Sequence, residues 1–140
     1  MISEDGKNQS SKSGSAAVEM TVEMAKALEA KIILLHVVEE MPAYVSVHLP
    51  ADIRKNVTAA AREDMEAVAK AYGLDGKAEI VVREGNPGAD ILDFANDNGI
   101  DMIVMSSHDP GVADYLLGSV SSRVVCHAHC SVLVVRQRNS

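Results

Sequence analysis

The 140-residue chain has few aromatic side chains: no tryptophan, one phenylalanine and three tyrosines. Its core must therefore be built from Val, Ile, Leu, Met and Ala. No run of 18 apolar residues occurs, and residues 1–15 lack the apolar stretch of a secretory signal, so we expect no membrane insertion. Only two cysteines are present. This scarcity suits a reducing compartment, and we expect a cytoplasmic protein.

Positive charge is also scarce, because 20 acidic residues face 13 basic ones and the formal net charge is −7. This balance disfavours binding to nucleic acid or to anionic lipid. The 47% hydrophobic and 24% charged content is typical of a globular protein. A chain of this length forms one domain. We therefore expect a single domain over residues 1–140, with a polar segment at 1–15.

Hydrophobic periodicity predicts helices that alternate with strands. Near-continuous apolar runs predict buried strands at 31–38, 101–106 and 131–136, and a more alternating run predicts an edge strand at 77–83. Helical spacing of apolar residues predicts helices near 17–28, 51–72, 89–98 and 119–128, with Ile53 and Val57 on the apolar face of the second. Residues 39–50 predict a loop. Such alternation indicates parallel βαβ units in an open α/β sheet, Rossmann-like or flavodoxin-like, with helices on both faces and any ligand at the carboxyl ends of the strands.

Gly118 and Ser119 stand at the start of the last predicted helix, after a buried strand. The first backbone N–H groups of a helix favour an anion, usually a phosphate. Gly118 lets the backbone approach a ligand closely, and the hydroxyls of Ser119 and Ser121 can be offered to a phosphate beside the helix dipole. An ordinary helix start has the same sequence, so this motif alone names no reaction.

The segments that carry a family resemblance all lie in the C-terminal part of the chain: Ser106-Ser107-His108, Leu116-Leu117-Gly118-Ser119-Val120, His127-Ala128, and Cys130-Ser131-Val132-Leu133-Val134-Val135. Together they resemble a universal stress protein, whose members typically carry Gly-x2-Gly-x9-Gly-Ser/Thr, a helix ending in His-Ala, and Cys-Pro-Val-Leu-Val-Val. The resemblance covers about residues 13–136. It implies an adenine nucleotide alpha hydrolase-like fold and a small stress-response regulatory protein. It also implies binding of ATP or AMP, with Mg²⁺, and at most weak ATP hydrolysis.

The resemblance implies a nucleotide site at the strand ends and at the start of the last helix. Asp5 matches an aspartate that holds the adenosine part, and Val38 matches a position that lines the adenine pocket. The residues implied for the whole site are Asp5, Val38, Met105, Ser106, His108, Gly111, Gly118, Ser119, Val120 and Ser121.

The loop before Gly118 departs from the family pattern. Ser106 and Asp109 stand where Gly-x2-Gly would be, and Asp109 would repel a triphosphate. Eight residues, instead of nine, separate Asp109 from Gly118, and Gly111 can serve as the flexible position. Family members without these glycines often do not bind ATP. One alternative is therefore a protein-interaction module of the same fold with an unidentified protein partner. A flavin- or dinucleotide-binding enzyme is a third, although aromatics are few and Gly-x-Gly-x-x-Gly is absent.

The sequence predicts only four strands. The family's central first strand ends in an Asp-Gly-Ser-like turn, and residues 1–7 resemble only the tail of that segment. Without this strand, its two neighbours would leave buried N–H and C=O groups unpaired, at about 1–3 kcal/mol each. We therefore expect a chain truncated within the first strand or begun at a misassigned start. The alternative is a sheet with fewer strands.

The last predicted strand forms an apolar edge if the strand order follows the family. Such an edge aggregates unless it is paired, and the resemblance implies a homodimer through Val132, Leu133, Val134 and Val135.

Nearby, two cysteines and two histidines fall within residues 126–130. A short helix that runs into a strand cannot easily direct all four to one tetrahedral metal. We expect no metal and no catalytic residue.

Overall fold

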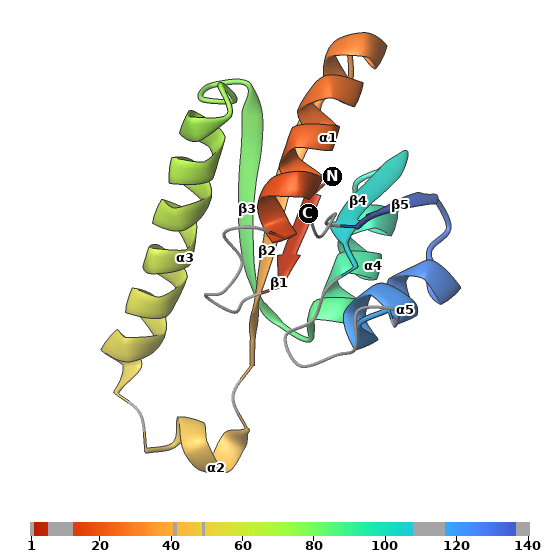
Figure 1. Cartoon of the computed structure of the whole chain (residues 1–140). Coiled ribbons are helices and arrows are strands. Elements are labelled where there is room, and N and C mark those ends of the chain that lie inside the picture. Colours follow the sequence, from red (N-terminus) through yellow and green to blue (C-terminus); the bar gives the residue numbers. More distant parts are fainter. Residues whose placement is uncertain (1, 6–12, 41, 49, 108–116, 137–140) are drawn as a thin grey trace.

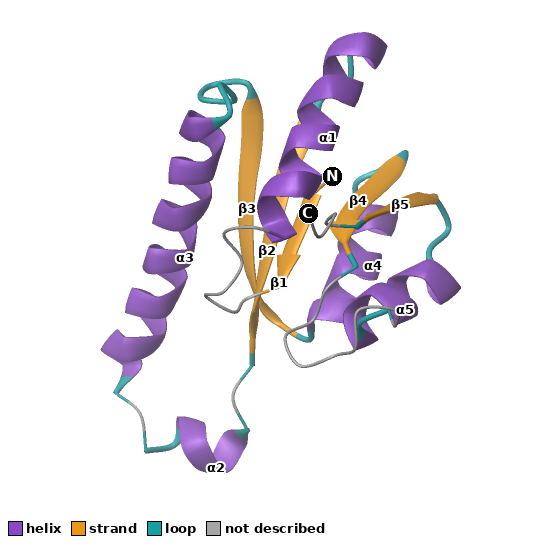
Figure 2. Cartoon of the chain, viewed as in Figure 1, coloured by secondary structure: helices purple, strands orange, loops and turns teal. Residues whose placement is uncertain are grey.

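The computed structural model describes residues 2–5, 13–40, 42–48, 50–107 and 117–136, which form one α/β domain (Figures 1 and 2). The strands are β1 (Ile2–Asp5), β2 (Ile32–Glu39), β3 (Ala78–Gly85), β4 (Met102–Ser106) and β5 (Ser131–Val135). The helices are α1 (Ser13–Leu28), α2 (Ala43–Ser46), α3 (Ala51–Ala71), α4 (Pro87–Asp97) and α5 (Ser119–His127). All strand pairs are parallel and the order is β3-β2-β1-β4-β5, which confirms the predicted fold class and the edge position of β3.

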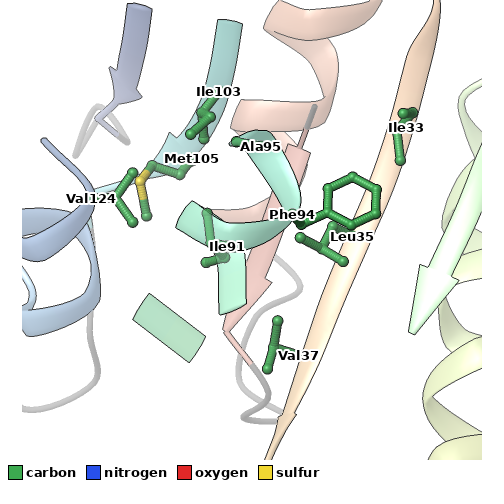
Figure 3. Close-up of a cluster of buried hydrophobic side chains, with 9 residues drawn as sticks. All are labelled: Ile33, Leu35, Val37, Ile91, Phe94, Ala95, Ile103, Met105 and Val124. Carbon is green, nitrogen blue, oxygen red and sulfur yellow. The ribbon is translucent and has the colours of Figure 1, made fainter. Parts of the chain in front are cut away.

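Helices pack on both faces of the sheet because alternate residues of each buried strand are apolar on both sides. On one face, α1 and α3 pack through Val18, Met65 and Ala69 against Ile32 and Leu34 of β2. On the other face, α4 and α5 cover a cluster drawn in Figure 3, whose buried members are Ile33, Leu35, Val37, Ile91, Phe94, Ala95, Ile103, Met105 and Val124. Among the described residues, no helix is both long enough and apolar enough to cross a membrane.

Residues 2–5 form the central strand, so the prediction of four strands without this element is wrong. Ile2 pairs with Leu34 of β2 on one side and with Val104 of β4 on the other. The segment has one apolar residue in four and therefore no strand pattern of its own. Pairing with two buried neighbours imposes the extended conformation, because their backbone groups would otherwise lack partners.

The connection between β2 and α3 also differs from the prediction, since α2 forms a short helix where a loop was expected. It lies beyond the carboxyl edge of the sheet, together with the first turns of α3 (Figure 1). Ile53 and Val57, expected on the buried face of α3, are each 40% exposed. The buried contacts of α3 come from Met65 and Ala69, where the helix lies over the sheet.

A turn that contains Gly85 and Gly88 starts α4, which begins two residues before the predicted helix. Asn86 is the N-cap residue, and its Oδ1 accepts a hydrogen bond from Ala89 N at 3.1 Å, while Pro87 occupies the first helical position. This turn leaves the carboxyl end of β3, so α4 begins at the same edge of the sheet as α5. Helix starts and strand ends therefore gather at one edge.

Candidate functional site

The carboxyl ends of β1 and β4 form the switch point of the sheet. From β1 the chain builds β2 and β3 on one side, and it then crosses over to build β4 and β5 on the other. In open α/β sheets, ligands bind beside such a point. Asp5 ends β1 and Ser106 ends β4, while Val38 lies one residue beyond the β2 partner of Asp5. The structure thus brings these three predicted site residues to neighbouring strand ends.

Helix α5 begins beside the end of β4, with Gly118 as its N-cap residue. The N–H groups of Val120 and Ser121 have no acceptor within the helix, because they belong to its first turn. Gly118 has φ −62° and ψ 160°, which any residue can adopt. A need for glycine here would therefore come from close approach of a ligand, not from backbone strain.

Two hydrogen bonds attach this helix start to the residues at the end of β4, and a third joins that segment to β5. The hydroxyl of Ser121 donates to the carbonyl of Ser106 at 2.8 Å, and the amide of Gly118 donates to the carbonyl of Ser107 at 3.3 Å. The amide of Ser107 in turn donates to the carbonyl of Val135 at 3.1 Å, at the end of β5. Ser107 is 8% exposed and uses both main-chain groups in this network. Sequence analysis included Ser107 in a segment of the family resemblance but assigned it no role.

The predicted site side chains differ in how accessible they are. Ser119 is exposed, at the first helical position. Met105 is 2% exposed in the core, and Val120 packs against the same cluster, so only their backbone groups can face a ligand. The prediction that the Ser121 hydroxyl is offered to a phosphate is wrong for this structure, because Ser121 is 2% exposed and its hydroxyl donates to Ser106.

Two predicted residues, His108 and Gly111, lie outside the described residues, and so does the departure from the family pattern at Asp109. Val132, Leu133, Val134 and Val135 lie on the edge strand β5, where all four are half-buried. Cys126 is an exposed free thiol and Cys130 a half-buried one. Within the part of the chain that the structure describes, no three His, Cys, Asp or Glu side chains are grouped closely enough to hold a metal ion.

Comparison with known proteins identifies the family. Residues 8–136 match the model of the universal stress protein family. The chain is 32% identical to the universal stress protein MJ0531 of Methanocaldococcus jannaschii, over 86% of this chain and 74% of that protein. It is 31% identical to the universal stress protein YxiE of Bacillus subtilis, over 97% of each. The solved structure of UspA from Lactobacillus plantarum superposes with a TM-score of 0.77 at 25% identity, over 96% of each chain.

Two further solved structures of the same fold contain an adenine nucleotide. A universal stress protein in complex with cAMP has a TM-score of 0.67 at 23% identity, over 96% of this chain and 94% of that one. A family protein from Arabidopsis thaliana with AMP bound has a TM-score of 0.64 at 23% identity, over 98% and 91%. The family match over residues 8–136, the two curated relatives and the shared fold lead to one conclusion: this chain belongs to the universal stress protein family.

Proposed function

We propose that the chain is a small stress-response regulatory protein that binds ATP or AMP where β1, β4 and α5 meet. The observation that carries this proposal is the start of α5, which hydrogen bonds hold beside the end of β4 at the switch point of the sheet. An adenine nucleotide supplies an anion for the helix start and a nucleoside for the strand ends. The cAMP and AMP complexes of related proteins support the same class of ligand.

The chemistry expected at this site is binding. Main-chain N–H groups of Val120 and Ser121, with the hydroxyl of the exposed residue Ser119, suit a phosphate, and neither kind of group acts as a general base at neutral pH. Asp5 and Val38 would hold the adenosine part, as in the family. With ATP, Mg²⁺ would accompany the phosphates. We propose at most slow ATP hydrolysis, so that nucleotide occupancy, and not turnover, carries the signal.

The binding experiment is calorimetric titration of the whole chain with ATP plus Mg²⁺ and with AMP. The test variant is Gly118→Val, which obstructs close approach to the helix start without straining a backbone of φ −62°. Ser122→Ala, a hydroxyl deletion on the same helix turn, is the matched control. Micromolar binding that is lost only in Gly118→Val supports the proposal. No binding by a folded wild-type chain refutes it.

The proposed assembly is a homodimer through β5. Among the described residues, this strand pairs only with β4, and its four valine and leucine residues remain half-buried in one chain. An unpaired apolar edge favours pairing with a second copy. Leu133→Lys, which places a charge on the edge, should convert a two-chain particle into a monomer in sedimentation velocity. A wild-type chain that sediments as a monomer at high micromolar concentration would refute the dimer.

The second candidate is a protein-interaction module that binds no nucleotide. Ser106 and Asp109 occupy the glycine positions of the family loop, and the hydroxyl of Ser121 is already bonded to Ser106. Apolar side chains are also exposed beyond the carboxyl edge, where Tyr44 is 76% and Val47 is 77% exposed. Exposed apolar groups of this kind favour a protein contact. A folded chain that fails to bind nucleotide in the titration would favour this second candidate.

A further inference from the structure

Ser121 is the third residue of α5, yet its side chain turns away from solvent. It is 2% exposed, and its hydroxyl donates to the carbonyl oxygen of Ser106 at 2.8 Å, 15 positions earlier in the chain. Ser106 is the last residue of β4. Serine near a helix start more often caps its own helix or faces water. Here the hydroxyl joins the first turn of α5 to the carboxyl end of β4, the strand beside the central strand β1.

A second attachment lies one turn away. The amide of Gly118 donates to the carbonyl of Ser107 at 3.3 Å, and Ser107 is itself fixed to Val135 of β5. Two attachments on opposite ends of one helical turn define the direction of that turn as well as its position. Val124, which is fully buried under the next turn, holds the helix to the same face of the sheet.

We propose that Ser121 is a positioning residue for the phosphate part of the ligand, an inference that rests on the proposed nucleotide site. Its hydroxyl does not serve as a phosphate ligand, because it is buried and donates to Ser106. It acts by holding the N–H groups of the first turn of α5 in a fixed direction beside the ends of β1 and β4. Preorganised donors bind an anion more tightly than donors that must first be ordered.

This role predicts a selective effect on binding. The adenosine part of the ligand rests on the ends of β1 and β2, which the Ser121 hydroxyl does not contact. Loss of the hydroxyl frees the helix start and leaves the Ser106 carbonyl without this donor. Binding of ligands with a phosphate should weaken, while binding of adenosine should not change. A general loss of folding would instead weaken the binding of ATP, AMP and adenosine together.

The experiment compares Ser121→Ala with wild type for ATP plus Mg²⁺, AMP and adenosine at 25 °C. Calorimetry measures the nucleotides, and an NMR titration measures the weaker adenosine. We expect Kd for ATP and AMP to rise about tenfold, the size of one lost hydrogen bond. Kd for adenosine should stay within about twofold, as expected when no contact is lost. Ser122→Ala, on the next residue, should leave all three values unchanged.

The outcomes separate this inference from the proposed function. If wild type binds no nucleotide, the proposed function fails. If wild type binds and Ser121→Ala binds ATP equally well, the positioning role is wrong. A parallel loss of adenosine and ATP would also overturn it. Far-UV circular dichroism establishes that each variant is folded. If Ser121→Ala does not fold, Ser121→Cys fills nearly the same volume with a weak donor and should show the same selective loss.

Discussion

The core beneath the candidate site predicts a large, position-dependent cost for Ile91→Ala. Ile91 is fully buried in the cluster that also contains Met105 and Val124, between α4 and the strands (Figure 3). The substitution removes three carbons, worth about 2.4 kcal/mol of transfer free energy at about 0.8 kcal/mol each. The residual cavity adds to this cost, and the better helix propensity of alanine offsets less than about 0.7 kcal/mol. We therefore expect the free energy of unfolding to fall by about 3–4 kcal/mol.

Ile53 provides the matched control, because it is also an isoleucine inside a helix but is 40% exposed. Ile53→Ala loses only part of the transfer free energy, because the side chain is already partly in water, and it leaves no closed cavity. We therefore expect the free energy of unfolding to fall by about 1 kcal/mol. Urea denaturation followed by far-UV circular dichroism measures both, with equal m-values showing that the denatured states are comparable. Ile91→Val should fall between wild type and Ile91→Ala, at about 0.5–1.5 kcal/mol. Equal losses for Ile91→Ala and Ile53→Ala would refute the burial argument.

Three smaller changes test local features by the same urea assay. Glu29 has φ 53°, where a non-glycine residue is strained, so Glu29→Gly should raise the free energy of unfolding by about 0.5–1 kcal/mol; a loss would contradict the strain. Asn86→Ala removes the N-cap bond to Ala89 and should cost about 1 kcal/mol, whereas no change would show that the cap contributes nothing. Lys31 pairs with Glu79 at 3.4 Å, but their side chains are 75% and 52% exposed. The free energy of unfolding of Lys31→Ala should therefore stay within about 0.5 kcal/mol of wild type. A larger loss would contradict the argument that water screens this exposed ion pair.

Hydrophobic pattern predicted most of the fold because the buried strands carry it themselves. The run that became β2 has four successive buried residues, Ile32 to Leu35, and so short a run is typical of a strand covered on both faces. β1 escaped the same reasoning, since Ile2–Asp5 owes its conformation to hydrogen bonds from two neighbouring strands. A pattern within one segment cannot reveal pairing that its neighbours impose. The exposure of Ile53 follows the same rule, because it depends on where the sheet ends beneath α3.

The candidate site was predictable in its location but not in the roles of its serines. A buried strand followed by Gly118 and a helix predicts an anion site at one edge of the sheet, and in the structure α5 begins at that edge. The sequence offered Ser119 and Ser121 as equivalent hydroxyls. They differ because successive helical residues are rotated by about 100°, so that residue 119 faces solvent while residue 121 faces the sheet.

Because Ser119 faces solvent and Ser121 faces the sheet, the two serines of the family motif have different roles in this chain. If nucleotide binding depends on main-chain N–H groups, direct contacts between first-turn side chains and the ligand matter less than the direction in which the turn is held. The bonds from Ser121 to Ser106 and from Gly118 to Ser107 supply that direction from the strand side. Ser106 in place of the first loop glycine then remains compatible with binding as long as these two attachments persist. Affinity for nucleotide should accordingly follow changes at Ser121 more closely than changes at Ser122, the neighbouring hydroxyl.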